Sequence, residues 1–255
     1  MKTNILKVIP ILTCLLTMVY SCKDKKAETF RTFGRVMDYD KNTYDVIQIG
    51  CQYWMKQNLR TTHYNNGDPI EKIVENNECC TLNKIGYYAD YSSNLIVDTI
   101  YGKFYNWHAV ETGKLAPKGW HVATKEDWEI LKKTIGPDAT GNKLRTTYGW
   151  NDSNTIAGKG TDDYAFSALS TGYKNWGSGY WPASNPISQL NVTVFWTSTN
   201  DGSACNRDGQ NYPYSVIIGL ANKDLIMENC NCHNFEYSVR CVRDDSCKKN
   251  KNDPQ

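Results

Sequence analysis

The sequence lacks the short motifs that mark the common catalytic sites. It contains no Gly-x-Ser-x-Gly, no His-Glu-x-x-His and no phosphate-binding loop. Histidine is scarce, and no carboxylate partner for His63, His108 or His121 can be identified from the sequence. Internal repeats are also absent, which argues against a solenoid or a propeller. We therefore expect a protein that is not an enzyme and that needs no cofactor, apart from the calcium considered below.

A surplus of charge of either sign is lacking too. The chain carries 29 basic and 27 acidic residues, and removal of residues 1–21 takes only Lys2 and Lys7 from this balance. No basic surplus is then left to neutralise phosphates, so nucleic acid is not an expected partner. Outside the N-terminus, no apolar run reaches the length of a membrane span.

The N-terminus has the layout of an export signal followed by a tether. Lys2 and Lys7 precede an apolar run over residues 8–19, and the small Ser21 stands directly before Cys22. Residues 19–22 resemble a bacterial lipobox, which predicts cleavage after residue 21 and acylation of Cys22. Because several acyl chains give a stable anchor, we expect residues 22–32 to tether the protein to the outer membrane, on the cell-surface or the periplasmic face. The alternative is ordinary secretion with a free Cys22.

Eight cysteines remain when the signal peptide and Cys22 are set aside. An even number in an exported chain indicates disulfides. We expect Cys241, in a predicted final strand, to pair with Cys205, Cys230 or Cys232. If reduced, Cys230 and Cys232 could instead bind zinc with the His that follows them, but an oxidising compartment favours disulfides.

The densest aromatic stretch, residues 101–131, contains one predicted helix. Thr124 takes the N-cap position and Asp127 follows three residues later, as in a capping box. Trp128, Leu131 and Ile135 then recur at spacings of three and four, which predicts a helix over residues 125–135 with one buried face. A Gly-Pro pair ends it.

Short apolar or alternating segments predict strands on both sides of this helix. Phe104, Tyr105 and Trp107 are expected to pack against the helix, and the Gly-, Asn- and Asp-rich intervals are expected to be loops. Together these patterns predict an α+β, loop-rich domain with short antiparallel strands and about two helices. The predicted strands are residues 33–49 with a turn at 38–42, then 85–89, 120–123, 164–169, 192–197, 214–220 and 237–242.

Eight segments, spread over residues 34–244, carry a family resemblance. In one-letter code they are DVIQIGCQYWM at 45–55, NLRTT at 58–62, YNNG at 64–67, YGKFYNW at 101–107, LAPKGWHVATKEDW at 115–128, FSAL at 166–169, FWTST at 195–199 and SVRCVRD at 238–244. In this order they resemble the Fibrobacter succinogenes major paralogous domain, a family of secreted or surface proteins of Bacteroidetes and Fibrobacteres. The resemblance implies a C-type-lectin-like fold over residues 33–244, distantly related to formylglycine-generating enzymes. Residues 245–255 are then a polar tail.

The loop over residues 172–185 is the best candidate for a binding surface. Trp176, Tyr180 and Trp181 lie among Gly and Ser residues, with neither helical nor strand periodicity. Aromatic side chains on a loop offer flat apolar faces on which sugar rings stack. They can also fold under the loop and plug it, and both interpretations stay open.

Calcium is the metal that the acidic loops suggest. Asp201, Asn206 and Asp208 could supply oxygen ligands, of which calcium takes about six to eight. The alternative is that these residues form solvated turns.

Three functions fit these features, in order of preference. The first is a lipid-anchored envelope or surface module that binds a glycan or a protein through its loops. The second is a structural or adhesin-assembly component of the envelope that binds no sugar. The third is an enzyme like the formylglycine-generating ones, which would need a reduced and solvent-reachable cysteine pair. Kinship of fold alone does not decide between them.

Overall fold

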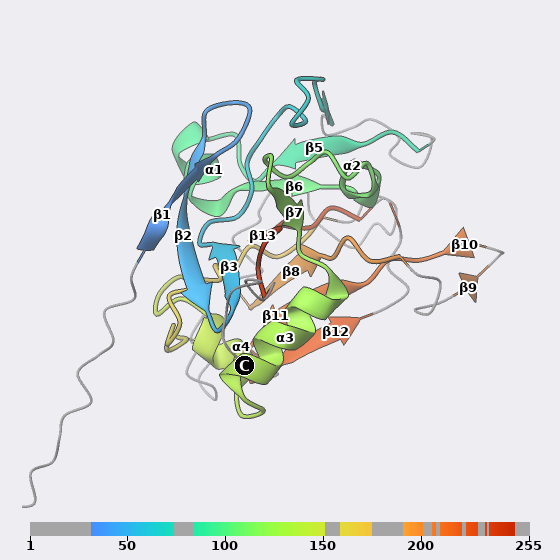
Figure 1. Ribbon diagram of the computed structural model, residues 1–255. Coiled ribbons are helices and arrows are strands. Elements are labelled where there is room, and N and C mark those ends of the chain that lie inside the picture. Colours follow the sequence, from blue (N-terminus) through green and yellow to red (C-terminus); the bar gives the residue numbers. More distant parts are fainter. Residues whose placement is uncertain are drawn as a thin grey trace, which may run out of the picture.

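A computed structural model gives the architecture of most of the domain. Within the described residues the chain forms four helices and thirteen short strands (Figure 1). The α+β, loop-rich prediction is confirmed. Among these residues, no helix combines the length and the apolar character needed to cross a bilayer. The structure describes residues 32–73, 84–150, 159–174, 191–200, 206–207, 210–220, 223–228, 233 and 235–247.

The largest sheet has five strands and brings the two ends of the domain together. Its order is β1-β2-β3-β13-β7, and all neighbouring strands are antiparallel. The strand near the C-terminus, β13, thus lies between β3 and β7, a strand from the middle of the chain. The strands are β1 (Thr32–Met37), β2 (Thr43–Ile49), β3 (Gln52–Met55), β13 (Cys241–Arg243) and β7 (Trp120–Val122).

Three smaller sheets complete the strands. An antiparallel sheet has the order β12-β11-β8, and a mixed sheet has the order β4-β5-β6 with β4 and β5 parallel. A two-stranded ribbon pairs β9 with β10. Their bounds are β8 (Val192–Trp196), β11 (Ser215–Gly219), β12 (Leu225–Glu228), β4 (Glu71–Lys72), β5 (Tyr87–Asp90), β6 (Lys103–Tyr105), β9 (Asn206–Arg207) and β10 (Gln210–Asn211).

Four helices occur where about two were expected. Only α3 was located in advance, and the other three lie in stretches that were assigned to loops or left without a helix. Each of those three has seven residues or fewer, which is too short for a clear periodic signal. The helices are α1 (Leu95–Tyr101), α2 (Trp107–Glu111), α3 (Lys125–Ile135) and α4 (Thr140–Leu144).

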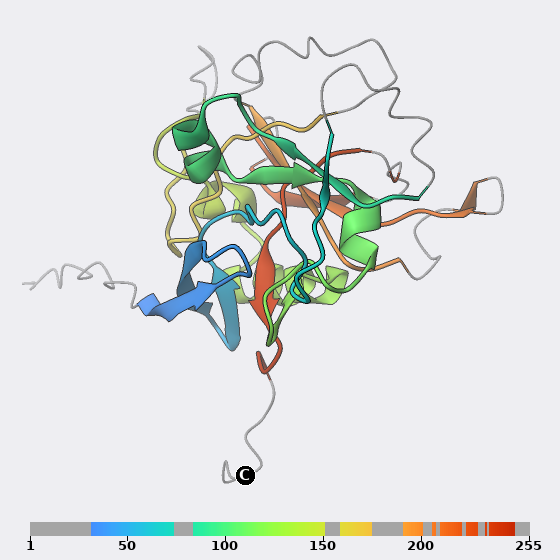
Figure 2. The same ribbon diagram turned by 90° about the horizontal axis from the view of Figure 1, so that it is seen from above.

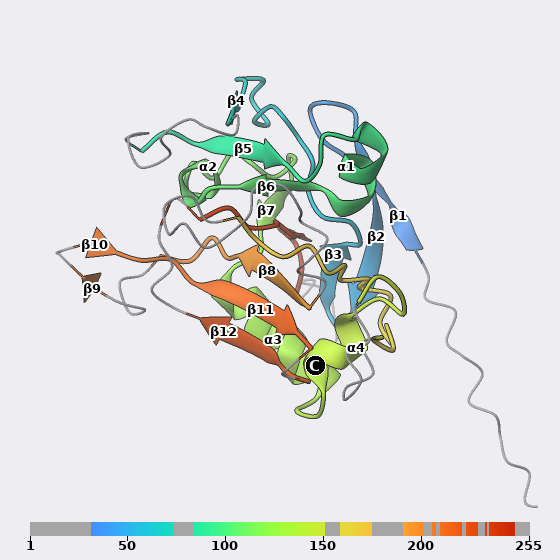
Figure 3. The ribbon, with the colours of Figure 1, turned by 180° about the vertical axis from the view of Figure 1, so that it is seen from behind.

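Helix α3 supplies the centre of the main core. Its predicted capping box is present, since Asp127 N donates to Thr124 Oγ1 and Thr124 N donates to Asp127 Oδ2. The centre of the Trp128 ring lies 4.9 Å from that of Trp54 and 5.4 Å from that of Phe195, so α3 packs against residues of the five-stranded and the three-stranded sheets (Figures 1 and 3). Phe104, Tyr105 and Trp107, expected to pack against this helix, belong instead to two other buried clusters.

The strand predicted at residues 164–169 is wrong. Ala165 and Ser167 have positive φ angles of 53° and 54°, which a strand does not allow. Asp162 accepts hydrogen bonds from Ser167 N and Oγ, so the segment turns back on itself. The buried Arg240 stabilises this turn, because its guanidinium donates to the carbonyl oxygens of Phe166 and Ser167.

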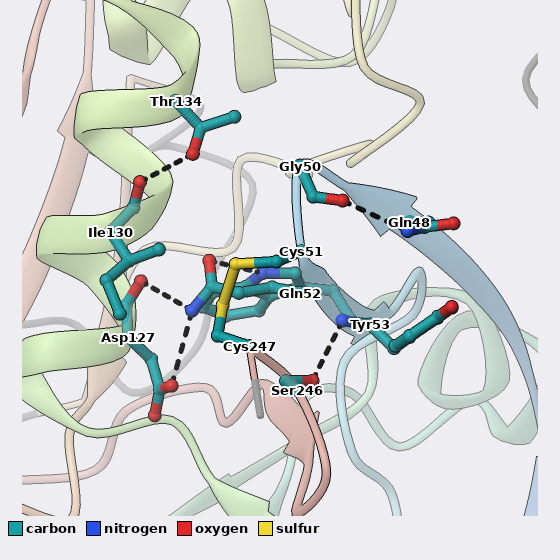
Figure 4. The surroundings of a disulfide bond; sticks show 11 residues. Gln48, Gly50, Cys51, Gln52, Tyr53, Asp127, Ile130, Thr134, Ser246 and Cys247 are labelled. Carbon is teal, nitrogen blue, oxygen red and sulfur yellow. Dashed lines mark hydrogen bonds between the residues drawn. A yellow bond between two sulfur atoms is a disulfide. The ribbon is translucent and has the colours of Figure 1, made fainter. Parts of the chain in front are cut away.

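One disulfide closes the domain at its edge. Cys51, in the turn between β2 and β3, is bonded to Cys247, which lies 196 residues further along (Figure 4). Beside it Tyr53 N donates to Ser246 Oγ, and Cys247 N donates to the carbonyl oxygen of Cys51. Cys247, in the stretch predicted to be a polar tail, is therefore fixed to the turn between β2 and β3.

The disulfide predicted for Cys241 is wrong. Its thiol is free and completely buried in β13. Burial raises the pKa of this thiol far above its usual value, which keeps it protonated and unreactive. Cys241 pairs with Val122 in the sheet, so it serves as a small core residue between packed strands. Its proposed partners Cys205, Cys230 and Cys232 lie outside the described residues.

His121 joins the start of α3 to the end of β13. Its Nε2 lies 2.9 Å from Asp127 Oδ2 and its Nδ1 lies 2.8 Å from Asp244 Oδ1. Both ring nitrogens can donate only in the imidazolium form. The hydrogen bond to Asp127 outweighs burial, and with Asp244 it raises the pKa of His121 above 6.5. Burial acts to raise the pKa of Asp127, but the hydrogen bonds from His121 and Thr124 lower it below 3.8.

We expect this pairing to make stability fall as the pH rises above neutrality. Because the folded pKa of His121 is raised, its contribution is complete below pH 6.5 and is lost as the pH passes the folded pKa. Asp127 has the opposite pH dependence. Because its folded pKa is lowered, its contribution to stability is lost only when the pH falls below 3.8. Urea unfolding at pH 6 and pH 9 should show a loss of a few tenths to about 1 kcal/mol, given the partial solvent screening. His121→Gln should remove most of this difference. If the variant lost as much unfolding free energy between pH 6 and pH 9 as the wild type, the assignment of the pH dependence to His121 would be wrong.

Candidate functional site

A charged pocket lies between α1 and the turn that joins β1 to β2. Its volume is about 490 Å³, within the range of small-ligand sites. Figures 1 and 3 show α1 beside this turn from opposite sides. We call it the α1 pocket, and its lining residues are Asp40, Asn42, Arg60, Thr62, Leu95, Asp98, Thr99 and Lys103.

Asp40 is the most highly bonded group of the pocket. It accepts hydrogen bonds from Thr62 N, Thr62 Oγ1 and Thr61 Oγ1, and His63 Nδ1 lies 2.5 Å from its Oδ1. Burial alone would raise its pKa, but these hydrogen bonds lower the pKa below the ordinary value. Asp40 is therefore a fixed carboxylate that ties the β1–β2 turn to residues 61–63.

Arg60 forms the neighbouring wall. Its Nε donates to Asn42 Oδ1 at 3.3 Å and its Nη2 donates to the Thr43 carbonyl at 3.1 Å. The guanidinium also lies 4.8 Å from the centre of the Tyr44 ring. Asn42 is held in turn by Asp38, which accepts from its Nδ2 and its backbone N–H. The pocket therefore presents a preorganised cation and amide.

The opposite wall is an ion-pair chain. Lys103 Nζ contacts Asp98 at 3.1 Å and Asp90 at 2.5 Å, and Asp90 also contacts Lys72 at 2.5 Å. Burial acts to lower the pKa of Lys103, but Asp90 and Asp98 raise it, so the ammonium stays charged. Burial raises the pKa of Asp98. The hydrogen bond from Ser92 N and the charge of Lys103 lower it, but burial is the larger effect. Across its lining, the pocket balances two carboxylates with two cations.

Helix α1, which forms one rim, has its polarity reversed. Leu95, Ile96 and Ile100 are 80%, 73% and 50% exposed, whereas Asp98 is only 4% exposed. The helix begins where Asn94 Oδ1 accepts from Ile96 N and Val97 N. A surface helix usually buries its apolar side chains and exposes its charges. Here the Asp98 carboxylate points inward to Lys103 and three aliphatic side chains are exposed, while Val97 and Tyr101 pack against a buried cluster.

The structure also finds the histidine partners that the sequence did not reveal. His63 meets Asp40, His108 lies 2.5 Å from Glu111, and His121 lies between two carboxylates. Two of these pairs join residues far apart in the chain, so no local signal could have identified them. Only the spacing of three between His108 and Glu111 on α2 was visible in the sequence.

The residues predicted to bind ligands lie almost entirely outside the described ranges. This holds for the aromatic residues Trp176, Tyr180 and Trp181, for Asp201 and Asp208, and for the lipidation residue Cys22. Asn206 begins β9, but its side chain is not described. Within the part of the chain that the structure describes, no group of three or more His, Cys, Asp or Glu side chains is arranged to hold a metal ion.

A second cavity, of about 500 Å³, lies between α3 and the edge strand β12. Lys132 from α3 already donates to the Leu225 carbonyl across it. The α1 pocket has the richer set of fixed polar groups, and we take it as the candidate site.

Comparison with known proteins identifies the family. The model of the Fibrobacter succinogenes major domain matches residues 47–243, from within β2 to the last residue of β13. No curated protein and no solved structure matches the chain, so the C-type-lectin-like part of the resemblance stays a prediction. Because the family match covers most of the sequence, the chain belongs to the Fibrobacter succinogenes major domain family.

Proposed function

We propose that this protein is a lipid-anchored envelope module that binds a glycan in the α1 pocket and catalyses no reaction. The observation that carries the proposal is the composition of that pocket. Positively and negatively charged side chains that are held in place by hydrogen bonds line the cavity, and the exposed Leu95 side chain lies beside them. The lipid anchor rests on Cys22 and the residues before it.

The hydrogen-bonding groups suit a ligand rich in hydroxyls. A hydroxyl donates and accepts at once, so it can bridge a carboxylate and a cation. Asp40, Asn42 and Arg60 on one wall and Asp98 and Lys103 on the other offer such pairs. Their internal hydrogen bonds hold them in place before binding, which reduces the entropy lost on association.

The charge balance argues against strongly ionic ligands. Two carboxylates and two cations give the pocket no net charge to attract a phosphate or a metal ion. Leu95 adds an apolar surface against which the C–H face of a sugar ring can pack. A neutral or weakly charged glycan is therefore the best-matched ligand.

Arg60→Gln should weaken glycan binding at least about tenfold, since it removes a charged hydrogen-bond donor from the pocket wall. The measurement is a glycan array on the soluble chain, residues 27–255, with calcium and with chelator. Arg35→Gln is the matched control, because Arg35, on β1, pairs with Asp45 of β2 and does not line the pocket. A blank array with a folded wild-type chain would contradict glycan binding and leave the assembly role, in which a protein is the partner.

The same array tests the aromatic loop separately. If Trp176→Ala or Trp181→Ala abolishes binding while Arg60→Gln does not, the ligand site lies in the loop over residues 172–185 rather than in the α1 pocket. A loss with chelator in the wild-type chain would support the calcium prediction at Asp201, Asn206 and Asp208.

The enzyme alternative finds little support among the described cysteines. Cys51 and Cys247 are joined in a disulfide and Cys241 is buried. In this part of the chain, no reduced pair faces solvent.

A further inference from the structure

The hydrogen bonds inside the α1 pocket are distributed unevenly between its negative and its positive groups. The lining contains two carboxylates and two cations. An ionised carboxylate can only accept hydrogen bonds, whereas a guanidinium or an ammonium can only donate them. A ligand therefore meets only the lone pairs and N–H groups that the protein itself leaves unpaired. Which of these remain determines the class of ligand that the pocket can bind.

The two carboxylates retain little capacity to accept. Asp40 accepts four hydrogen bonds from residues 61–63, and an ionised carboxylate has about four lone-pair sites. Three of the four bonds reach Oδ2, so Oδ1 keeps room for one ligand hydroxyl. Asp98 is buried, and its oxygens accept from Ser92 N and Lys103 Nζ. The pocket thus offers a ligand few acceptors from its charged groups.

Arg60, in contrast, retains most of its donors. A guanidinium has five N–H groups. Here Nε donates to Asn42 Oδ1 and Nη2 donates once, to the Thr43 carbonyl. The other three N–H groups, two of them on Nη1, have no hydrogen-bond partner among the described residues. Arg60 can therefore donate two parallel hydrogen bonds to one ligand group.

Two further donors lie in the same lining. Lys103 Nζ has three N–H groups, of which two donate to Asp90 and Asp98. Asn42 Nδ2 has two, of which one donates to Asp38 Oδ2. Each of them keeps one N–H group without a partner in the described part of the chain. The charged and amide groups of the pocket therefore have a surplus of donors, although their charges balance.

The Arg60 guanidinium is held in one orientation. One edge of it is fixed by Asn42 and Thr43, and its centre lies 4.8 Å from the centre of the Tyr44 ring. Arg60 lies in the segment that follows β3, and Figure 2 shows this segment between the β1–β2 hairpin and α1. A planar guanidinium that is fixed in this way matches the planar, two-oxygen geometry of a carboxylate.

We propose that the glycan bound in the α1 pocket carries a carboxylate, as uronic and sialic acids do, and that Arg60 binds this carboxylate. The inference rests on the proposed glycan binding and adds the class of sugar. A carboxylate is an acceptor without donors, so it suits the surplus of donors. Lys103 and Asn42 can donate to the ring hydroxyls beside it, and Asp40 Oδ1 can accept from one of them.

The other charges of the pocket limit the ligand to this single negative charge. A phosphate dianion would also face Asp40 and Asp98, and the pocket has no net positive charge to offset that repulsion. A neutral sugar would offer Arg60 only hydroxyl oxygens. These form weaker hydrogen bonds with a cation than a carboxylate does, because only one partner is then charged.

The test compares glycans in pairs that differ in one group. An array carries uronic-acid and sialic-acid glycans, and each stands beside the same glycan with its carboxylate reduced to a primary alcohol. The soluble chain, residues 27–255, contains every described element and is applied at several concentrations, so that each pair gives a ratio of dissociation constants. For the pairs that bind, we expect the acidic member to bind at least about tenfold more tightly.

Variants assign this preference to Arg60. Arg60→Gln should bring the ratio within each pair close to one. Arg35→Gln should keep both the binding and the ratio, since Arg35 pairs with Asp45 and does not line the pocket. If Arg60→Gln fails to fold, Arg60→Lys takes its place. It keeps the charge but not the planar fork, and it should lower the ratio at least about threefold.

Three results would overturn the inference while glycan binding stands. The first is equal binding to both members of each pair. The second is binding confined to neutral glycans, or to sulfated glycans without a carboxylate. The third is an unchanged ratio in the Arg60 variant, which would place the carboxylate elsewhere on the protein. A blank array would instead contradict glycan binding itself, so failure of the proposed function and failure of this inference are distinguishable.

Discussion

Replacing Cys51 and Cys247 together by serine is expected to lower the free energy of unfolding by up to about 5 kcal/mol. The two residues are 196 positions apart, and the entropy removed from the unfolded chain grows with the length of the closed loop. Both residues are exposed and sit at the edge of the fold, so serine leaves no cavity. The measurement is urea unfolding of both proteins without reductant.

Cys241→Ala is the control for this experiment. That residue is a buried free thiol, so its loss removes only a small packed group and should cost about 1 kcal/mol. A double serine variant within about 1 kcal/mol of the wild type would show that the loop-closure account does not hold here.

The second large effect is expected at Arg240, a fully buried cation that forms no ion pair with a carboxylate of the described residues. Its Nε donates to Asn58 Oδ1, its Nη1 donates to the carbonyls of Met55 and Phe166, and its Nη2 donates to that of Ser167. Burial lowers the pKa of its guanidinium to about 9, so it stays charged at neutral pH. Arg240→Met removes all four hydrogen bonds and leaves their buried acceptors unpaired. We expect a loss of about 3–5 kcal/mol in urea unfolding.

Two variants delimit the Arg240 effect. Arg240→Lys keeps the charge but not the planar fork, so it should be nearly as destabilising. Arg243→Gln, three residues further along at the end of β13, removes a partly exposed arginine that stacks on Tyr53 and should cost less than about 1 kcal/mol. If Arg240→Met and Arg243→Gln were equally stable, the central role of Arg240 would be wrong.

The elements that could be predicted are those whose signal is local. The start, buried face and end of α3 follow from residues within about a dozen positions of one another. Strands β2, β7, β8 and β11 carry short apolar runs that indicate them directly. Helix α1 was missed because Leu95, Ile96 and Ile100 are exposed and Asp98 is buried, which reverses the pattern that a sequence reading relies on.

The remainder depends on contacts between distant segments. The strand expected at residues 164–169 has a reasonable composition, but Asp162 and Arg240 impose a turn. The α1 pocket draws its lining from residues near 40, 60 and 100, and nothing in one segment points to the others. Pairing of Cys51 with Cys247 was one of many possible connections for eight cysteines.

The disulfide also determines how the domain responds to mechanical load. The Cys51–Cys247 bond closes a covalent ring that contains every described element from β3 to β13. If the chain is anchored through Cys22 as proposed, tension between the anchor and the C-terminus passes through the sulfur atoms, so the ring cannot be extended. Among the described elements, only β1 and β2 lie between the proposed anchor and the ring, and their turn carries Asp40 and Asn42 of the pocket. If the chain is anchored and binds a ligand in the α1 pocket as proposed, a pull on that ligand is resisted first by the β1–β2 hairpin, whose rupture would open the pocket and release the ligand while the ring stays folded.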